Sequence, residues 1–248
     1  MDTIKIPRKQ ALMVAHRGVS SLERENSVAA FVAAGNRSYF GIETDVHKTA
    51  DGSFVIIHDK TTGRVSPTDV NVEECSPEEL AAVRLYGYDG QTPRADLCLP
   101  SLSDYIAACR RYGKTAVLEL KSNFNVDDLR RMCEEIETQD YLSRVIFISF
   151  SFENLRRLRE VHPEQPVQYL RSDANKEELI ALVKKHGMDL DVHFDMITKE
   201  FVDACHKEGI KVNVWTVDSP ELAEKVIDAG VDFVTSNRLN DFASLSGS

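Results

Sequence analysis

Residues 41–59 read GIETDVHKTADGSFVIIHD, which contains two short apolar runs typical of β-strands. The first run, Gly41–Val46, carries two carboxylates, and a loop with Asp51-Gly52 separates it from the second run, Ser53–Asp59. Similar runs occur along the rest of the chain, at Leu12–His16, Thr115–Leu120, Val145–Phe150, Val167–Leu170, Leu190–Phe194, Lys211–Val217 and Phe233–Ser236. Together they predict eight regularly spaced strands, with Ser53–Asp59 as an additional one.

Helical patterns separate the eight regular runs. They cover Ser27–Asn36, Ser103–Tyr112, Val126–Thr138, Phe152–Val161, Lys176–His186, Thr198–Glu208 and Ser219–Ala229. Several begin with a capping residue, such as Ser219 before Pro220, and end near a glycine, such as Gly187. This alternation within 248 residues predicts a single domain over residues 1–248, an α/β fold built as one TIM (β/α)₈ barrel. A doubly wound open sheet shows the same alternation, and periodicity does not exclude it.

Residues 60–100 break the alternation. This stretch is polar and rich in Thr, Pro, Gly and Asp, with a helical turn or two expected near Ser76–Leu85. A connection of this length inside a compact domain is usually an inserted subdomain or a functional lid. We therefore expect a small insertion after the Ser53–Asp59 strand.

The chain is acidic, with a formal net charge of −10 at pH 7. Nucleic acid is thereby excluded as the main partner, because binding its phosphates needs a basic surface. An acidic protein that handles a small anionic substrate must supply positive charge locally, from a metal or from a few placed Arg and Lys side chains.

The sequence shows no membrane-spanning segment, signal peptide or disulfide pattern, and these absences bear on where the protein is expected to be located. No apolar run is long enough to span a bilayer, and the N-terminal residues contain no apolar signal-peptide core. The five cysteines are odd in number, contain no C-x-x-C pair and are expected to be reduced thiols. A cytoplasmic location is the resulting prediction. A homodimer stays open, because barrels offer many surfaces for dimerisation and the sequence identifies none of them.

Charged residues collect where the predicted strands end, which is the active face of a TIM barrel. Glu43 and Asp45 are two apart in one strand and so lie on one face, and Glu119 ends the next barrel strand. Three inward carboxylates would repel one another without a cation, and an all-oxygen cluster suits Mg²⁺, Ca²⁺ or Mn²⁺ rather than zinc. The alternative is a set of rim carboxylates paired with Arg17 and Lys121.

A tight hairpin would bring a histidine to this cluster. If Asp51-Gly52 is a two-residue turn, Asp45 lies opposite His58 across the two strands. A three-residue turn or a bulge would instead move His58 to the other face. His16 ends the first strand, next to Gly41–Val46 in the barrel. Two histidines beside carboxylates and an Arg suit phosphoryl transfer, with one base, one acid, a metal and a guanidinium clamp.

The other histidines and the single tryptophan are less informative. Three histidines lie in helical patterns, where a solvated or capping role is expected: His162, His186 and His206. His47 alternates to the face opposite Asp45 and is interpreted as a surface residue. His193 is interpreted as structural. Trp215 either fills the core or forms a wall for the substrate, and the sequence leaves both open.

These residues form a series of motifs that resembles the glycerophosphodiester phosphodiesterases. The motifs are His16-Arg17-Gly18, Glu25-Asn26-Ser27, Glu43-Thr44-Asp45-Val46, Thr49-Ala50-Asp51-Gly52, His58-Asp59, Leu99-Pro100-Ser101-Leu102, Glu119-Leu120-Lys121 and Val214-Trp215-Thr216-Val217. They occur in the order and at the spacing of that family, from about the first predicted strand to the last. His-Arg-Gly alone would be a weak signal, but the full series is highly specific.

The resemblance implies a TIM barrel with an insertion after the His-Asp strand. It also implies hydrolysis of a glycerophosphodiester to sn-glycerol 3-phosphate and an alcohol. By position, the ligands of one divalent cation, Mg²⁺ or Ca²⁺, would be Glu43, Asp45 and Glu119, and the general acid/base pair would be His16 and His58. Substrate or phosphate would be held by Arg17, Lys121 and Trp215. Attack by the substrate's own glycerol hydroxyl, giving a cyclic phosphate, and direct attack by water both stay open.

The departures from the family pattern are modest. The usual Pro-Glu-Asn-Thr reads Arg24-Glu25-Asn26-Ser27, and the segment after His58-Asp59 keeps Arg64 while its neighbours change. No metal or acid/base position is lost, so a catalytically silent barrel is disfavoured. A phospholipase-like enzyme on a two-histidine barrel is the other alternative, and it would need an apolar or basic membrane-facing rim that the acidic chain does not suggest.

Overall fold

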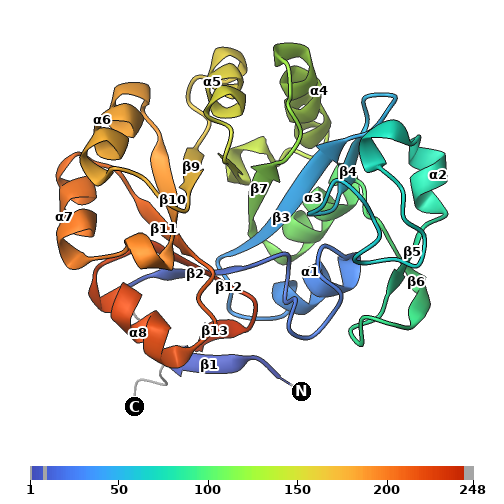
Figure 1. Ribbon diagram of the computed structural model, residues 1–248, viewed down its shortest axis with the longest axis horizontal. Coiled ribbons are helices and arrows are strands. Elements are labelled where there is room, and N and C mark those ends of the chain that lie inside the picture. The colour runs from blue at the N-terminus through green and yellow to red at the C-terminus, as the bar shows by residue number, and fades with distance from the viewer. Residues whose placement is uncertain (1, 8–9, 243–248) are drawn as a thin grey trace.

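A computed structural model describes residues 2–7 and 10–242, and its centre is a closed barrel of eight parallel strands (Figure 1). The strands follow the order β2-β12-β11-β10-β9-β8-β7-β3, and β3 pairs back with β2. This last pairing closes the sheet, which confirms the predicted TIM barrel and excludes the open doubly wound alternative. In sequence, the eight barrel strands are β2 (Leu12–Ala15), β3 (Gly41–Lys48), β7 (Thr115–Leu120), β8 (Val145–Ser149), β9 (Val167–Arg171), β10 (Asp189–His193), β11 (Val212–Trp215) and β12 (Phe233–Ser236).

Helices cover the outside of the barrel, where the outward side chains of the strands form the main hydrophobic core. The helices are α1 (Val28–Gly35), α2 (Pro77–Ala81), α3 (Leu102–Tyr112), α4 (Val126–Glu137), α5 (Phe152–Val161), α6 (Lys176–His186), α7 (Lys199–Lys207) and α8 (Pro220–Asp228). Their ends follow local rules. For example, Ser101 and Asp104 form a capping box at the start of α3, and Gly113 ends that helix with φ +64°.

Residues 60–100 form the expected insertion and pack on a small hydrophobic cluster of their own. The cluster joins insertion residues such as Val72 and Leu85 to Val55 and Ile57, which precede the insertion. The insertion contains a 3₁₀ turn (Val72–Glu74), α2 and the antiparallel pair β5 (Arg84–Tyr86) and β6 (Pro93–Cys98). The helix expected near Ser76–Leu85 is therefore only partly right, because it ends at Ala81 and Leu85 belongs to a strand.

Two short strands near the ends of the chain were not predicted. β1 (Ile4–Pro7) pairs in parallel with β13 (Leu239–Phe242), at the bottom of Figure 1. Parallel pairing between strands more than two hundred positions apart leaves no local turn signal in the sequence, since no hairpin joins them. The described residues contain no helix long and apolar enough to cross a membrane.

The expected register of the β3–β4 hairpin is wrong by one residue. In the structure Val46 lies opposite Ile56 and Lys48 opposite Phe54, with β4 spanning Phe54–Ile56. The connection is longer than two residues because the Asp51 carboxylate accepts hydrogen bonds from the Ser53 N–H and the Thr49 hydroxyl, which closes a wider loop. Asp45 therefore does not lie opposite His58. β4 ends at Ile56, so strand alternation does not control where the His58 side chain points.

Candidate active site

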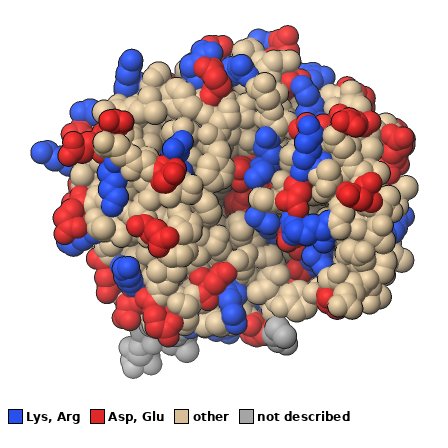
Figure 2. Space-filling model, viewed as in Figure 1, with Lys and Arg blue, Asp and Glu red and all other residues tan. Residues whose placement is uncertain are grey.

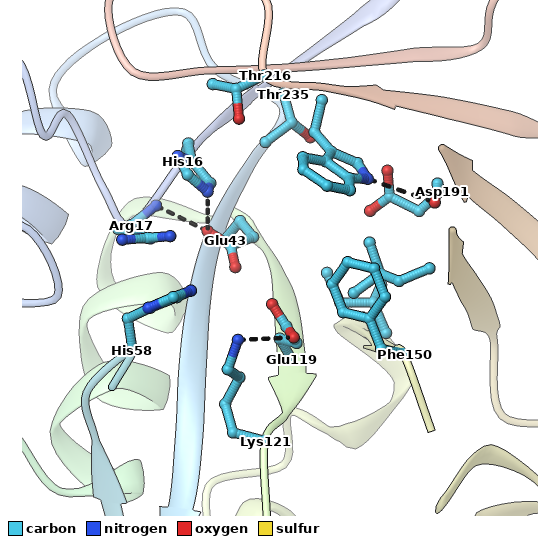
Figure 3. A pocket seen from close by; sticks show the side chains of 13 residues that line it. His16, Arg17, Glu43, His58, Glu119, Lys121, Phe150, Asp191, Thr216 and Thr235 are labelled. Atoms are coloured by element: carbon cyan, nitrogen blue, oxygen red, sulfur yellow. Dashed lines mark hydrogen bonds and ion pairs between the residues drawn. The ribbon is translucent and has the colours of Figure 1, made fainter. Parts of the chain in front are cut away.

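A cavity opens at the C-terminal ends of the barrel strands. Figure 2 shows a hollow on this face, with acidic side chains deep inside it and basic side chains close by. Figure 3 shows side chains from both sides of the barrel converging on it. The sequence-predicted residues that line it are His16, Arg17, Glu43, His58, Glu119, Lys121 and Trp215. The remaining one, Asp45, is fully buried beside Glu43 and Glu119. The structure thus brings all eight predicted site residues together.

The three predicted carboxylates form one cluster. Glu43 and Asp45 come from β3, and the parallel register places Asp45 beside Glu119 of β7. One carboxylate oxygen from each residue lies within 4.8 Å of the other two. All three side chains are buried, so they face one another in a region where little water screens their charges.

Burial and mutual repulsion shift the pKa values of these carboxyl groups apart. Burial, followed by the charge of Asp45, raises the pKa of Glu43 well above its usual range and that of Glu119 to about 7. Burial also opposes ionisation of Asp45, but the charges of Arg17, Lys121 and His58 outweigh it and lower the pKa of Asp45 to about 2. The protein's own cations therefore stabilise only one of the three carboxylates fully.

The acidic cluster is compatible with a divalent cation, and it also forms ion pairs with the protein's own basic side chains. Lys121 Nζ lies 3.0 Å from Glu119 Oε1, and Arg17 Nε lies 3.5 Å from Asp45 Oδ2. Asp45 Oδ1, however, is buried without a hydrogen-bond partner. It makes an ion-pair contact with Lys121 Nζ, at 3.6 Å. A buried carboxylate oxygen that accepts no hydrogen bond, next to two acids that resist ionisation, fits a divalent cation with oxygen ligands.

His16 is held by a hydrogen bond that sets its tautomer. The Asn237 side-chain amide donates to Asp218 Oδ2, so its oxygen faces His16 and accepts from His16 Nδ1 at 2.8 Å. His16 Nε2, the other ring nitrogen, faces the cavity and lies 3.9 Å from Glu43 Oε2. Burial, together with the nearby Arg17 charge, lowers the pKa of His16 to about 4. The imidazole is consequently neutral at pH 7, with a free lone pair on Nε2.

His58 reaches the cavity from just beyond the end of β4. Its Nδ1 donates to Asp59 Oδ1 at 2.6 Å, which leaves Nε2 as its second proton-transfer atom. Its main-chain carbonyl accepts a hydrogen bond from His47 Nε2 at 3.2 Å. The interpretation of His47 as a surface residue is therefore wrong. His47 does lie on the face opposite the carboxylates, but the insertion covers that face and leaves its side chain only 4% exposed.

Arg17 and Gly18 turn the chain tightly at the rim of the cavity. Both have left-handed backbone conformations, with φ of +54° and +76°. A Cβ on Gly18 would lie 2.7 Å from Ala30 of α1, so only glycine fits there. The turn lets the Arg17 main-chain N–H donate to Glu43 Oε2 at 2.8 Å. The His-Arg-Gly motif thereby places its backbone and its guanidinium against the acidic cluster.

Several residues around the site have partners that the sequence did not assign. Glu25 accepts from Arg17 Nη1 at 2.8 Å and from both terminal nitrogens of Arg64, and Arg64 also contacts Asp59. An unbroken chain of ion pairs and hydrogen bonds thus leads from Arg17 to His58. Asn26 Nδ2 donates to Asp45 Oδ2 at 2.7 Å. Glu25, Asn26 and Arg64 all stand in recognised motifs, and those motifs were the available signal.

The other wall of the cavity is largely apolar. Trp215 packs edge-to-face on Phe150, with ring centroids 5.7 Å apart, and both line the cavity. Trp215 therefore lines the cavity, and it also packs against the hydrophobic cluster inside the barrel. His193 packs against the same indole and accepts a hydrogen bond from the Asp195 N–H, which agrees with a structural role. Phe150 and Asp191 also line this side and were not predicted.

Comparison with known proteins agrees with this arrangement. A glycerophosphodiester phosphodiesterase of Caldanaerobacter subterraneus subsp. tengcongensis is 28% identical over 232 residues, covering 92% of this chain and 94% of the relative. A glycerophosphodiester phosphodiesterase structure from Parabacteroides distasonis matches with a TM-score of 0.75 and 27% identity, covering 93% of this chain and 94% of the other.

A third match concerns the fold alone. The structure of an Oleispira antarctica phosphodiesterase in complex with the product sn-glycerol-3-phosphate has a TM-score of 0.79 at 24% identity, covering 92% of this chain and 93% of the other.

The model of the glycerophosphoryl diester phosphodiesterase family matches residues 16–241, which include every residue of the cavity. The chain therefore belongs to the glycerophosphoryl diester phosphodiesterase family, and it is a phosphoric diester hydrolase.

Proposed function

We propose that this enzyme hydrolyses glycerophosphodiesters to sn-glycerol 3-phosphate and an alcohol, by histidine acid/base catalysis with one divalent cation. The observation that carries the proposal is a cavity lined by two histidines and an arginine beside a cluster of three buried carboxylates. A match to the family over residues 16–241 supports it, and so does the product bound to the Oleispira relative.

Glu43, Asp45 and Glu119 are the proposed ligands of the cation, Mg²⁺ or Ca²⁺. The donor set is all oxygen, and one of its buried oxygens accepts no hydrogen bond. When bound, the cation offsets the charge of the acidic cluster and of the phosphodiester, and it polarises the phosphoryl group. Arg17 and Lys121 supply the remaining positive charge, and we assign both to phosphate binding because they line the cavity and pair with these carboxylates.

His16 and His58 are the proposed acid/base pair. Each has Nδ1 engaged by an oxygen acceptor, which leaves Nε2 to move a proton. One ring removes the proton from the attacking hydroxyl, and the other donates a proton to the oxygen of the leaving alcohol. The attacking hydroxyl belongs either to the substrate's own glycerol or to water. Trp215 is assigned to the wall beside the carbon chain of the substrate.

The decisive test is release of glycerol 3-phosphate from a panel of glycerophosphodiesters, with EDTA and with Mg²⁺ or Ca²⁺ added back. Metal-dependent release establishes the reaction, and the ranking of the panel identifies the preferred alcohol. Following the reaction by ³¹P NMR detects a cyclic phosphate if the glycerol hydroxyl attacks first. A folded, metal-loaded protein that turns over no member of the panel would reject the proposal.

A further inference from the structure

The two sides of the cavity differ in chemistry (Figure 3). On one side lie the charged groups, among them His16, Arg17 and His58, each of which has a hydrogen-bond or ion-pair partner. Phe150 and Trp215 form the other side. A single carboxyl group, that of Asp191 on β10, lines this second side (Figure 3). An acid on the apolar side of the cavity needs an explanation.

The Asp191 carboxyl lacks a partner within the described residues. Its side chain is only 2% exposed, and Oδ1 is buried without a hydrogen-bond partner. The neighbouring donors are used elsewhere. Trp215 Nε1 donates to the main-chain carbonyl of Asp191, at 3.4 Å, and not to its carboxyl group. Asn213, which lies opposite Asp191 on β11, donates its amide to Gln168 Oε1 at 3.2 Å.

A purely structural role does not account for this group. A buried polar group without a partner costs free energy, and native proteins leave few of them unexplained. Asp191 is also not one of the three carboxylates whose oxygens cluster within 4.8 Å of one another. Burial, followed by the charge of Glu119, raises the pKa of Asp191 well above its usual range. A carboxyl oxygen accepts a hydrogen bond in either protonation state, so it can pair with an alcohol hydroxyl.

We propose that Asp191 is a specificity-determining residue that hydrogen-bonds a hydroxyl of the substrate's glycerol moiety. The inference rests on the proposed function, which places the phosphate between Arg17 and Lys121. From there a short carbon chain extends along Trp215, and its hydroxyl reaches Asp191. A phosphate ester of the same length without hydroxyls leaves the Asp191 carboxyl unpaired, and sites built to bind a hydroxyl discriminate strongly against such analogues.

Binding of two matched ligands tests this directly. The dissociation constants of sn-glycerol 3-phosphate and n-propyl phosphate are measured by calorimetry on the Mg²⁺-loaded protein. We expect the wild type to prefer glycerol 3-phosphate by about tenfold to a hundredfold. Asp191→Leu should reduce that preference to within about threefold, with binding of n-propyl phosphate kept or improved. Asp191→Asn, which still donates and accepts, should retain most of it.

Controls separate this inference from the proposed function. Asp189→Asn changes an acid two residues earlier on β10 that does not line the cavity, and it should keep the wild-type preference. Asp191→Ala, which adds no bulk, replaces Asp191→Leu if leucine disturbs the barrel. An active wild type that binds both ligands alike, or a folded Asp191→Ala that keeps the preference, overturns the role of Asp191. Failure of the wild type to release glycerol 3-phosphate from any diester overturns the proposed function instead.

Discussion

Each histidine of the cavity is held through one ring nitrogen, so that the other is directed to the reaction. The Asn237 carbonyl oxygen accepts from His16 Nδ1, and the Asp59 carboxylate accepts from His58 Nδ1. A fixed tautomer matters because a general base needs a lone pair, and a general acid a proton, at one defined atom. Asn237 and Asp59 thus orient the proposed acid/base pair, and neither of them lines the cavity.

Replacing either histidine should abolish most of the turnover and leave the fold intact. We expect His16→Ala and His58→Ala each to lower kcat by about 10²- to 10⁴-fold, the usual contribution of a general acid or base. Steady-state release of glycerol 3-phosphate measures this, with circular dichroism to verify folding. His206→Ala is the matched control, because His206 pairs with Asp232 away from the cavity. Wild-type turnover in either cavity variant would reject the assigned role.

The insertion contributes to the site through Arg64. This side chain bonds Glu25, which holds Arg17, and Asp59, which holds His58. A segment outside the barrel alternation thus contacts the carboxylates that hold Arg17, which follows β2, and His58, which follows β4. The 3₁₀ turn of the insertion also helps to hold His58. Its Glu73 lies 3.3 Å from Nδ1 of the buried His47, and His47 Nε2 donates to the His58 main-chain carbonyl.

Removal of the Arg64 side chain should therefore lower activity. We expect Arg64→Ala to reduce kcat/KM about tenfold or more, since Glu25 and Asp59 would both lose a charge-assisted hydrogen bond that orients them. Arg94→Ala is the matched control. Arg94 also lies in the insertion and pairs with Glu23 and Asp96, neither of which contacts Arg17 or His58. Equal effects of the two variants on kcat/KM would show that Arg64 acts only through general stability.

The turn between β2 and α1 provides a test of backbone geometry. Gly18→Ala should lower the free energy of unfolding by about 2–4 kcal/mol, because it combines a left-handed φ with a clash against Ala30. Gly209→Ala has nearly the same φ, +75°, but nothing within 4 Å of the added Cβ, and should cost about 1 kcal/mol. Urea denaturation compares the two. If both variants lose the same stability, the close approach of α1 has no energetic importance.

For the whole molecule, the acidic cluster links stability to pH and to the cation. In the metal-free protein the pKa of Glu119 is about 7, against an ordinary value of 4.5, and that of Glu43 is also raised. Between pH 4.5 and about pH 7, Glu119 keeps a proton in the native state that it has released in the unfolded chain. The free energy of unfolding therefore falls as pH rises through this range. The proposed cation would remove that penalty, because it would stabilise the ionised carboxylates.

Saturating Mg²⁺ or Ca²⁺ should consequently raise Tm more at pH 8 than at pH 5. Comparing loaded and metal-free protein at each pH cancels most of the opposite contribution of His16, whose lowered pKa costs stability as pH falls from about 6.5 to about 4. Glu119→Gln should flatten the pH dependence of the metal-induced gain. Scanning calorimetry at both pH values provides the measurement, and an equal gain at pH 5 and pH 8 would contradict this linkage.

The sequence alone determined most of the secondary structure, which depends on local signals, and the grouping of site residues, which follows from the shared face of barrel strand ends. Apolar runs, caps and glycines placed the eight barrel strands and their helices, because these signals act within a few residues. The carboxyl ends of parallel barrel strands share one face, so strand positions in the sequence were enough to group His16, Glu43, Asp45 and Glu119. Arg17 and Lys121 follow the same strand ends. His58 was expected there from a hairpin register that proved wrong, and the family motifs at the right spacing supported all three.

Only the tertiary structure decided the features that depend on partners distant in sequence. The hairpin register differed from expectation because the Asp51 side chain closes a wider loop. His47 is buried because the insertion folds back over it, and the β1–β13 pair joins the two ends of the described chain. In the sequence, nothing distinguishes Asp191 from the other residues expected to face the inside of the barrel. Its lack of a partner exists only once the barrel has closed, because burial and hydrogen bonding are properties of neighbours in space.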